Sequence, residues 1–340
     1  MNSIGLTMGD PAGVGPELII RLLEQLDPEK SPPLILIGDD AILNRALDQF
    51  GGKKARAWFN TAEIWDPARA PSPAPLIILS RTNLSPRKIP LERAGKKYGK
   101  ASWEYIETAV KLCQEKICSG IVTLPVNKSA MLKAGCPCPG HTDLLARLDE
   151  KKRAVMMMVL GKLRVALLTH HLPLRDVPRK IEKTKIVSIL KIMDQALKTD
   201  FRIKNPGIGI LGLNPHSGEG GRIGDEEIKI LGPAIKQAQS RGINARGPIS
   251  GDTAFTRAKT GEFDALLALY HDQGIAPIKA LGFERVVNVT LGLSFVRTSP
   301  GHGTAYDIAW QGKADPTGLL EAFKLAQRLI KNREPNYAGK

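Results

Sequence analysis

The stretch IGLTMGDPAGVGPELIIRLLEQL, residues 4–26, sets a pattern that the rest of the chain repeats. Ile4–Met8 is a short apolar run typical of a buried strand, and after a Gly/Pro segment apolar residues follow at helical spacing from Pro16 to Leu26. Leu34–Ile37 and the helical stretch Ala41–Phe50 repeat this order. Alternation of strand and helix predicts an α/β fold with a largely parallel sheet.

The same order continues towards the end of the chain. We expect strands at Leu76–Leu79, Gly120–Val126, Gly207–Leu213, Asp264–Tyr270 and Val286–Leu293, and helices at Gly99–Ser119, Thr184–Leu197, Asp225–Arg241 and Thr317–Lys331. The middle of the chain differs, because Ala154–Leu160 and Leu163–Thr169 are two β-rich runs separated only by Gly161-Lys162. This spacing predicts a β-hairpin.

Composition bounds the class of protein. The chain has 340 residues, 42% of them hydrophobic and 24% charged, which is ordinary for a globular protein and excludes a disordered chain or a fibre. At about 150 residues per domain, two domains are expected. The net charge of +15 suggests anionic partners, but the basic residues are scattered and aromatic residues make up only 5%, so we expect a solvated basic surface rather than nucleic-acid binding.

Location is predicted from cysteines and from the absence of targeting signals. No apolar run approaches the roughly 20 residues that a membrane span needs, so no membrane partner is expected. The first residues lack the basic and apolar regions of a secretory signal. The four cysteines, at 113, 118, 136 and 138, match no common zinc spacing and are expected to be idle thiols in a reducing cytoplasm.

Histidines supply the first hint of chemistry. Of only six, His171, His216 and His271 each follow a predicted strand. Ligands of open α/β sheets bind at the carboxyl ends of the strands, so three strand ends could bring three imidazoles to one metal ion. The alternative is that each is an isolated loop histidine.

Other polar residues lie at similar positions. His141 and Thr142 stand at a predicted helix start, where a simple helix cap is the alternative. Lys279 and Arg297 are cations near the same strand ends and could hold a phosphate or carboxylate, although surface charges are equally consistent with the pattern. The Gly-rich segments 9–17 and 214–225 match neither the GxGxxG dinucleotide fingerprint nor a Walker loop.

Seven longer segments, taken together, resemble the 4-hydroxythreonine-4-phosphate dehydrogenase family. They are MGDPAGVGPE (8–17), TLPVNK (123–128), GHTDLLA (140–146), THHLPLRDV (169–177), LNPHSGEGGRIGDEE (213–227), YHDQGIAPIKALGF (270–283) and VNVTLGLSFVRTSPGHGTAYDIA (287–309). The resemblance extends over nearly the whole chain.

The resemblance implies a fold similar to isocitrate and isopropylmalate dehydrogenases. That fold has two α/β/α domains with a cleft between them and binds NAD without a Rossmann GxGxxG motif. We therefore expect an outer, cofactor-side domain of residues 1–127 plus 278–340, and an inner, metal-side and dimer-side domain of residues 128–277. The NAD loop would include His302, Gly303, Thr304 and Asp307, because HGTAYDI resembles the HGSAPDI loop of isopropylmalate dehydrogenase.

The resemblance also assigns site residues. It implies one divalent metal (zinc, magnesium or cobalt) held by His171, His216 and His271, and an active site at the interface of a homodimer. The substrate contacts that it implies are His141, Thr142, Lys279, Asn288 and Arg297. A general base is needed as well, and Asp252 and Lys279 are the candidates.

The family reaction is NAD-dependent oxidation, with decarboxylation, of 4-phosphohydroxy-L-threonine to 3-amino-2-oxopropyl phosphate in vitamin B6 biosynthesis. Two departures from the family pattern leave the substrate open. Thr123-Leu-Pro125 stands where TGP is expected, and residues 140–143 read GHTD, with Asp143 in place of the glutamate of the expected GHTE. Related enzymes oxidise 4-phospho-D-threonate or 4-phospho-D-erythronate, so these are the alternative substrates. A basic nucleic-acid-binding protein is the remote alternative.

Overall fold

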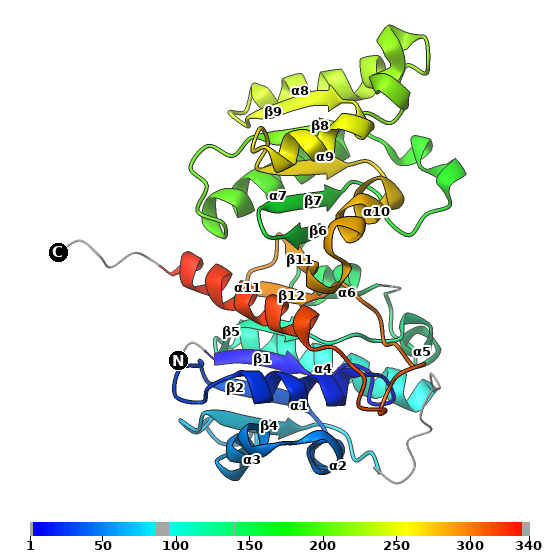
Figure 1. Cartoon of the computed structure of the whole chain (residues 1–340). Helices are drawn as coiled ribbons and strands as arrows, with labels where there is room; N and C mark the ends of the chain where they lie inside the picture. Colours follow the sequence, from blue (N-terminus) through cyan, green and yellow to red (C-terminus); the bar gives the residue numbers. More distant parts are fainter. Residues whose placement is uncertain (1–2, 86–94, 139, 335–340) are drawn as a thin grey trace, which may run out of the picture. The chain divides into compact units, whose positions relative to one another are not determined.

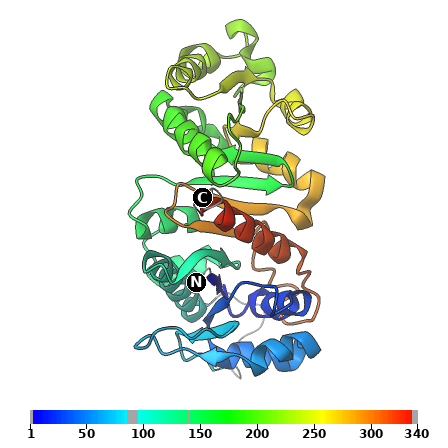
Figure 2. The same cartoon turned by 90° about the vertical axis from the view of Figure 1, so that its left-hand side faces the viewer.

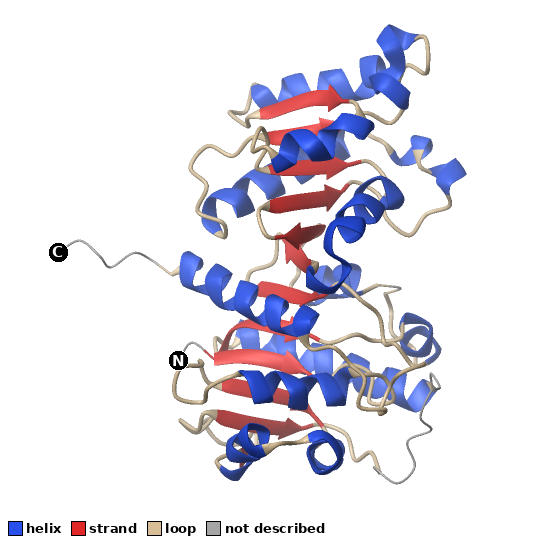
Figure 3. Ribbon diagram, in the orientation of Figure 1, coloured by secondary structure: helices blue, strands red, loops and turns tan. Residues whose placement is uncertain are grey.

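The computed structural model describes residues 3–85, 95–138 and 140–334, which divide into two compact units. Unit 1 comprises Met1–Lys152 and Leu293–Ile330, and unit 2 comprises Arg153–Gly292 and Lys331–Lys340. Helices and strands alternate in both (Figure 3). The α/β class predicted from the sequence is confirmed.

Unit 1 is built on a parallel sheet. Its strands lie in the order β3 (Glu63–Ile64), β4 (Leu76–Ser80), β2 (Leu34–Gly38), β1 (Ser3–Thr7), β5 (Cys118–Thr123) and β12 (Val296–Pro300). Helices α1 (Gly15–Gln25) and α11 (Thr317–Arg333) cover one face, and α4 (Lys96–Gln114) covers the other (Figures 1 and 2). Because both faces are covered, a central strand such as β2 is buried along its whole length.

The smaller helices explain where unit 1 ends. Helices α2 (Asp40–Phe50) and α3 (Lys53–Asn60) pack on α1, while α5 (Lys128–Lys133) and α6 (His141–Leu148) pack on α4. The last two helices therefore belong to unit 1, whose first segment runs to residue 152 rather than to the expected limit at 127. The second boundary was expected between residues 277 and 278 and lies between 292 and 293. It is later because the strand at residues 287–291 pairs within unit 2.

Unit 2 has a mixed sheet. Its strands lie in the order β11 (Val287–Leu291), β6 (Val155–Leu160), β7 (Leu163–Leu167), β10 (Ala265–Ala268), β8 (Ile208–Leu211) and β9 (Ala245–Ile249). The strand β6 is antiparallel to both of its neighbours, and the other four strands after it are parallel. Helices α7 (Lys183–Thr199) and α8 (Gly232–Gln239) lie on one face, and α9 (Gly251–Lys259) and α10 (His271–Gly282) lie on the other (Figures 1 and 2).

Two local predictions can be compared with this sheet. The hairpin at Gly161-Lys162 is confirmed, since Leu160 pairs with Leu163 and Gly161 has φ +59°. The helix expected over Asp225–Arg241 is divided, because a π-helical turn at Glu227–Leu231 precedes α8.

Two negative expectations bear on the class of protein. In the part of the chain that the structure describes, no helix is both long and apolar enough to cross a membrane. All four cysteines are free thiols, and burial raises the pKa of Cys118 to about 12, so this thiol is unreactive at neutral pH.

Candidate functional site

The carboxyl end of the unit 1 sheet holds a buried cation. Arg297 lies on β12 beside β5 and is only 1% exposed. Its Nε and Nη2 donate to Oγ1 of Thr123, the last residue of β5, at 3.1 and 2.6 Å. Burial lowers the pKa of the guanidinium to about 9, so the group keeps its charge at neutral pH. Taking such a charge out of water is costly, and an anionic ligand would offset the cost.

A histidine with an unused nitrogen lies within the field of this cation. His141 is the first residue of α6, and its Nε2 is buried and has no hydrogen-bond partner among the described residues. Burial lowers the pKa of His141 well below its usual value, and the positive charges of Arg297 and Lys128 lower it further. A buried polar atom without a partner calls for an explanation, and a ligand absent from the structure provides one.

Thr142 and Lys128 complete this group. Thr142 is buried next to His141, and no side chain caps α6 at Gly140, so the simple capping role is not observed. Lys128 opens α5 and its side chain is exposed; partial desolvation lowers its pKa, and the charge of Asp143 opposes this shift. We call Arg297, His141, Thr142 and Lys128 the anion cluster. Its positive charge, buried at Arg297 and exposed at Lys128, suits a phosphate or carboxylate.

The carboxyl ends of three adjacent strands of unit 2 each supply a histidine. His171, His271 and His216 follow β7, β10 and β8, which are neighbours in that order. The rings of His171 and His271 are 5.7 Å apart between centroids. The Nδ1 atom of His216 instead lies 3.7 Å from Oε1 of Glu219. We call the three histidines the histidine edge.

The described residues at the histidine edge do not form a three-ligand metal site. Among the residues that the structure describes, no group of three or more His, Cys, Asp or Glu side chains could hold an ion. Two of the three predicted ligands are therefore adjacent, and His216 is not grouped with them. His271 is oriented by Asp272, whose Oδ1 lies 2.8 Å from its Nδ1.

Backbone strain marks the histidine edge as unusual. His171 and His216 have φ +54° and +52°, and Ser217 and Glu219, next to His216, are also left-handed. Left-handed backbone is unfavourable for residues other than glycine and often marks functional turns. Buried Glu227 supports the turn by accepting hydrogen bonds from the backbone N–H groups of residues 213 and 214, at 2.7 and 2.8 Å.

The two candidate bases differ in their surroundings. Lys279 in α10 is partly buried, and burial lowers its pKa, which favours proton acceptance. Asp252 is exposed at the start of α9, and its pKa is lowered, chiefly by the Ser250 side chain, so it is the weaker acceptor. Asn288, on β11, has a buried Oδ1 without a partner in the described part of the chain. It is available to a ligand, as the prediction requires.

The predicted cofactor residues lie in the loop between β12 and α11, residues 301–316, which packs on the first Gly/Pro motif. The backbone carbonyl of Thr304 accepts from Val14 N–H at 3.0 Å, and the hydroxyl of Tyr306 donates to Oδ2 of buried Asp10 at 2.6 Å. Gly13 has no room for a side chain, because an added Cβ would meet the Thr304 carbonyl at 2.9 Å. The two motifs, almost 300 residues apart, thus form one structure within unit 1.

Sequence reasoning did not single out several residues that the structure places at these sites. Thr123 belongs to the segment Thr123-Leu-Pro125, whose sequence does not show that its hydroxyl accepts hydrogen bonds from Arg297. Asp10 and Tyr306 lie inside quoted motifs, but nothing in their spacing shows that they contact each other. The signal that could have found them is a charged residue in an otherwise apolar Gly/Pro loop.

The comparisons with known proteins cover nearly all of the chain. Residues 29–326 match the family "Pyridoxal phosphate biosynthetic protein PdxA". The chain is 42% identical to the 4-hydroxythreonine-4-phosphate dehydrogenase of Desulforapulum autotrophicum, over 95% of this chain and 94% of the relative. It is 37% identical to the D-threonate 4-phosphate dehydrogenase of Salmonella typhimurium, over 96% and 98%.

A solved structure supports the same assignment. The crystal structure of 4-hydroxythreonine-4-phosphate dehydrogenase from Klebsiella pneumoniae is similar to this chain with a TM-score of 0.84 and 36% identity, covering 97% of this chain and 100% of that one. Sequence and fold therefore agree over almost the whole length. The chain belongs to the PdxA family of pyridoxal phosphate biosynthetic proteins.

Proposed function

We propose that this protein is an NAD-dependent dehydrogenase that converts 4-phosphohydroxy-L-threonine to 3-amino-2-oxopropyl phosphate and CO2, in vitamin B6 biosynthesis. The observation that carries the proposal is the anion cluster, a desolvated positive group in a chain whose relatives are named for phosphorylated substrates. The cytoplasmic location expected from the sequence belongs to the same proposal.

The anion cluster would hold an anionic end of the substrate. Arg297 offers a planar set of N–H donors, which matches the oxygens of phosphate or carboxylate. His141 offers its unused Nε2, and a bound anion would raise the depressed pKa of the ring and favour the protonated, donating form. Fixing this end orients the carbon that reacts.

The histidine edge fits a divalent ion by its chemistry. His171 and His271, with His216, would hold zinc, magnesium or cobalt, which would lower the pKa of the substrate hydroxyl and stabilise the alkoxide. Imidazole nitrogens suit such ions, and the 5.7 Å separation of two rings is consistent with a shared ligand. The proposal includes the homodimer that the family resemblance implies, with the site shared by its two subunits.

Lys279 is the better candidate to accept the hydroxyl proton, because burial favours its neutral amine. NAD, when bound, would supply the acceptor for the hydride of C3, and the product would be a 3-oxo acid. That acid loses CO2 because its carboxylate is β to the new carbonyl. His302, Gly303, Thr304 and Asp307 would hold the adenosine part of NAD, and Asn288 would contact the substrate.

A second substrate is favoured by specific observations. The D-threonate 4-phosphate dehydrogenase of Salmonella typhimurium is 37% identical over nearly the full length. The chain also departs from the expected TGP and GHTE motifs at Leu124 and Asp143, and Asp143 lies close enough to Lys128 to affect its pKa. Oxidation of 4-phospho-D-threonate or 4-phospho-D-erythronate is therefore the alternative.

Parallel kinetics would test both possibilities. NADH formation is measured on the three phosphorylated substrates after chelation and after zinc, magnesium or cobalt is restored. We expect activity only with metal, and the highest kcat/KM for 4-phosphohydroxy-L-threonine. A higher value for either acid would establish the alternative. A salt-dependent shift of nucleic acid in a gel, with no NADH from any substrate, would replace the enzyme proposal altogether.

The ligand assignment has a matched control. His170 is adjacent to His171, at 5.3 Å between ring centroids, but is not a predicted ligand. We expect His216→Ala to lose bound metal and to lower kcat/KM by at least about 100-fold, while His170→Ala keeps its metal. Unchanged metal content and activity in His216→Ala would contradict the assignment.

A further inference from the structure

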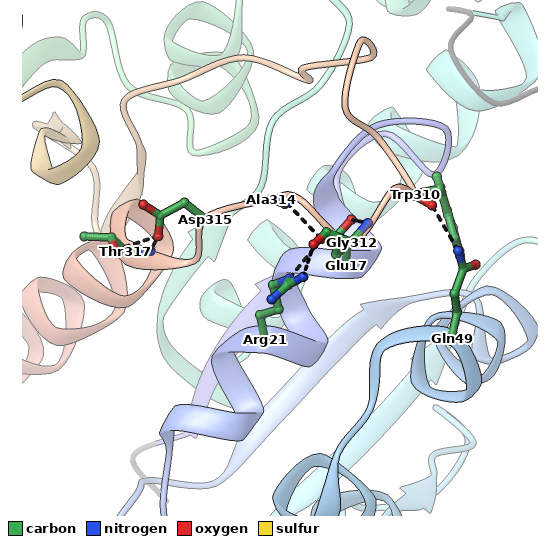
Figure 4. Close-up of polar contacts among 8 residues, drawn as sticks. All are labelled: Glu17, Arg21, Gln49, Trp310, Gly312, Ala314, Asp315 and Thr317. Atoms are coloured by element: carbon green, nitrogen blue, oxygen red, sulfur yellow. Dashed lines mark hydrogen bonds and ion pairs between the residues drawn. The ribbon is translucent and has the colours of Figure 1, made fainter.

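A buried carboxylate joins α1 to the loop that carries the predicted cofactor residues. Glu17 lies in the first turn of α1 and is 0% exposed. Its Oε1 accepts from the backbone N–H of Ala314 and from Nε of Arg21, both at 2.9 Å, and its Oε2 accepts from the N–H of Gly312 at 3.2 Å (Figure 4). A buried charge with three donors is well satisfied and strongly directional.

The same ion pair binds both sides of one residue. Arg21 donates from Nη2 to the carbonyl of Gly312, while Glu17 accepts from the Gly312 N–H. Gly312 has φ +73°, a conformation that a side chain would disfavour. The Glu17–Arg21 pair therefore fixes the position and the direction of the chain at this point.

Further contacts anchor the segment next to Gly312. The carbonyl of Trp310 accepts from Nε2 of Gln49 at 3.0 Å, and its indole N–H donates to the carbonyl of Pro11 at 3.0 Å (Figure 4 shows the first of these). The guanidinium of Arg45 lies 4.7 Å from the indole centroid. This half of the loop is thus held from α1, α2 and the first Gly/Pro motif.

Two of the predicted cofactor residues are open to solvent. Gly303 and Asp307 are exposed, and a Cβ built on Gly303 would meet no atom within 4 Å. The loop therefore exposes residues 303 and 307, is held to the first Gly/Pro motif at Thr304 and Tyr306, and is held again at residues 310–314. Such a division is expected of a binding loop whose shape is fixed before its ligand arrives.

We propose that Glu17, with Arg21, is a positioning residue that holds loop 301–316 in the shape that binds the adenosine part of NAD. The proposal rests on the proposed function, which assigns the cofactor to residues 302–307. Without the Glu17–Arg21 pair, the loop would be more mobile in the free protein and would lose more conformational entropy when NAD binds. Affinity for NAD would fall, whereas the chemical step at saturating NAD would keep its rate.

The test compares three variants by calorimetric NAD binding, steady-state kinetics and hydrogen exchange of residues 301–316. Glu17→Ala removes the acceptor, and Glu17→Gln keeps one carbonyl oxygen. Thr317→Ala is the matched control just beyond the loop, because it removes only the hydroxyl that donates to Oδ1 of Asp315 at 2.7 Å and leaves Glu17, Arg21 and Asp315 in place (Figure 4). Thermal midpoints are recorded for all of them.

We expect Glu17→Ala to raise the Kd and KM for NAD by about tenfold or more and to leave kcat and the substrate KM within about threefold. Glu17→Gln should recover part of the affinity. Thr317→Ala should lower the thermal midpoint without changing NAD affinity. Exchange at 301–316 should be faster in the Glu17 variants and slowed by NAD in the wild type.

Two results would separate the proposals. Suppose that NAD binds the wild type and protects loop 301–316, and that Glu17→Gln and Glu17→Ala bind NAD with the same affinity as the wild type. The positioning role is then wrong and the cofactor assignment stands. If Glu17→Ala does not fold, Glu17→Gln alone decides. If NAD fails to bind the wild type or to protect this loop, both the cofactor assignment and the positioning role are overturned.

Discussion

The anion cluster of unit 1 and the histidine edge of unit 2 both stand at the carboxyl ends of parallel strands, yet they are built differently. Arg297 is 1% exposed, and burial shifts the pKa values of Arg297 and His141. At the histidine edge, the side chains of His216 and His271 are 68% and 41% exposed. There the unusual feature is the backbone, since His171 and His216 are left-handed.

The difference shows two ways of preparing a site for a ligand. In the anion cluster, the ligand-free protein carries an electrostatic cost, which a bound anion would offset. At the histidine edge it carries a conformational cost, which metal coordination would offset. Substitutions at the two places should therefore change stability, pH dependence and ligand affinity in different ways.

The largest effect is expected at Arg297. A lysine keeps the charge but has a single ammonium group in place of the planar guanidinium. It therefore cannot donate to two oxygens in the same bidentate geometry. We expect Arg297→Lys to lower kcat/KM by about 100-fold, which corresponds to about 2.7 kcal/mol of transition-state stabilisation. Inorganic phosphate, measured by calorimetry, should also bind more weakly.

The control is an arginine whose fork serves structure. Arg333 donates from Nε and Nη2 to the two carboxylate oxygens of Asp200, each at 2.8 Å, within unit 2. Arg333→Lys should lower the thermal midpoint but leave kcat/KM unchanged. If Arg297→Lys behaved in the same way as Arg333→Lys, the buried arginine would be structural, and the contrast between the two regions would be lost.

A smaller effect is expected from the pH dependence of His141. Its folded pKa is lowered, so near pH 6.5 and below the unfolded chain binds more protons than the folded chain. Stability should therefore fall as the pH drops from 7 towards the folded pKa, by at most about 1.4 kcal/mol per pH unit from this group. Urea unfolding at several pH values would measure the slope.

His141→Gln isolates this contribution, because every other titrating group is shared with the wild type. The variant should show a shallower fall in stability between pH 7 and pH 5. Saturating phosphate should also flatten the wild-type curve, since an anion raises the His141 pKa. Parallel curves for the two proteins would mean that the buried ring does not titrate as its surroundings imply.

Much of the fold could be predicted from the sequence, because local pattern determines it. Continuous apolar runs such as Leu34–Ile37 indicate strands buried on both faces, and the structure has β2 there. Strands without such a run were missed: β9 contains Arg246, Gly247 and Pro248, and β12 has the polar sequence VRTSP. Their place depends on pairing with distant strands rather than on local hydrophobicity.

The site residues also divide into features that local sequence predicts and features that depend on distant parts of the chain. The positions of His171, His216 and His271 at strand ends could be read from the sequence, because a histidine after an apolar run is a local signal. Which of them contact one another could not, since backbone angles in the turn after β8 decide where His216 points. The burial of Arg297 was also hidden, because it depends on the strand β5 beside it.

The smallest effect tests whether the backbone strain at the histidine edge serves function. Ser217 has φ +53°, and its buried hydroxyl has no partner in the described part of the chain. Ser217→Gly should raise stability by about 0.5–1 kcal/mol, because glycine adopts this conformation without steric cost. Glu150, in unit 1, has φ +52° away from either site, so Glu150→Gly is the matched control and should stabilise similarly.

The two variants should differ only in metal binding. A glycine beside His216 also enlarges the range of conformations open to that turn, so the imidazole would be held less firmly before metal arrives. We therefore expect Ser217→Gly to weaken metal affinity severalfold and Glu150→Gly to leave it unchanged, by titration of the chelated protein. Equal metal affinities of Ser217→Gly and Glu150→Gly would show that the left-handed turn does not strengthen metal binding. The backbone strain at the histidine edge would then need another explanation.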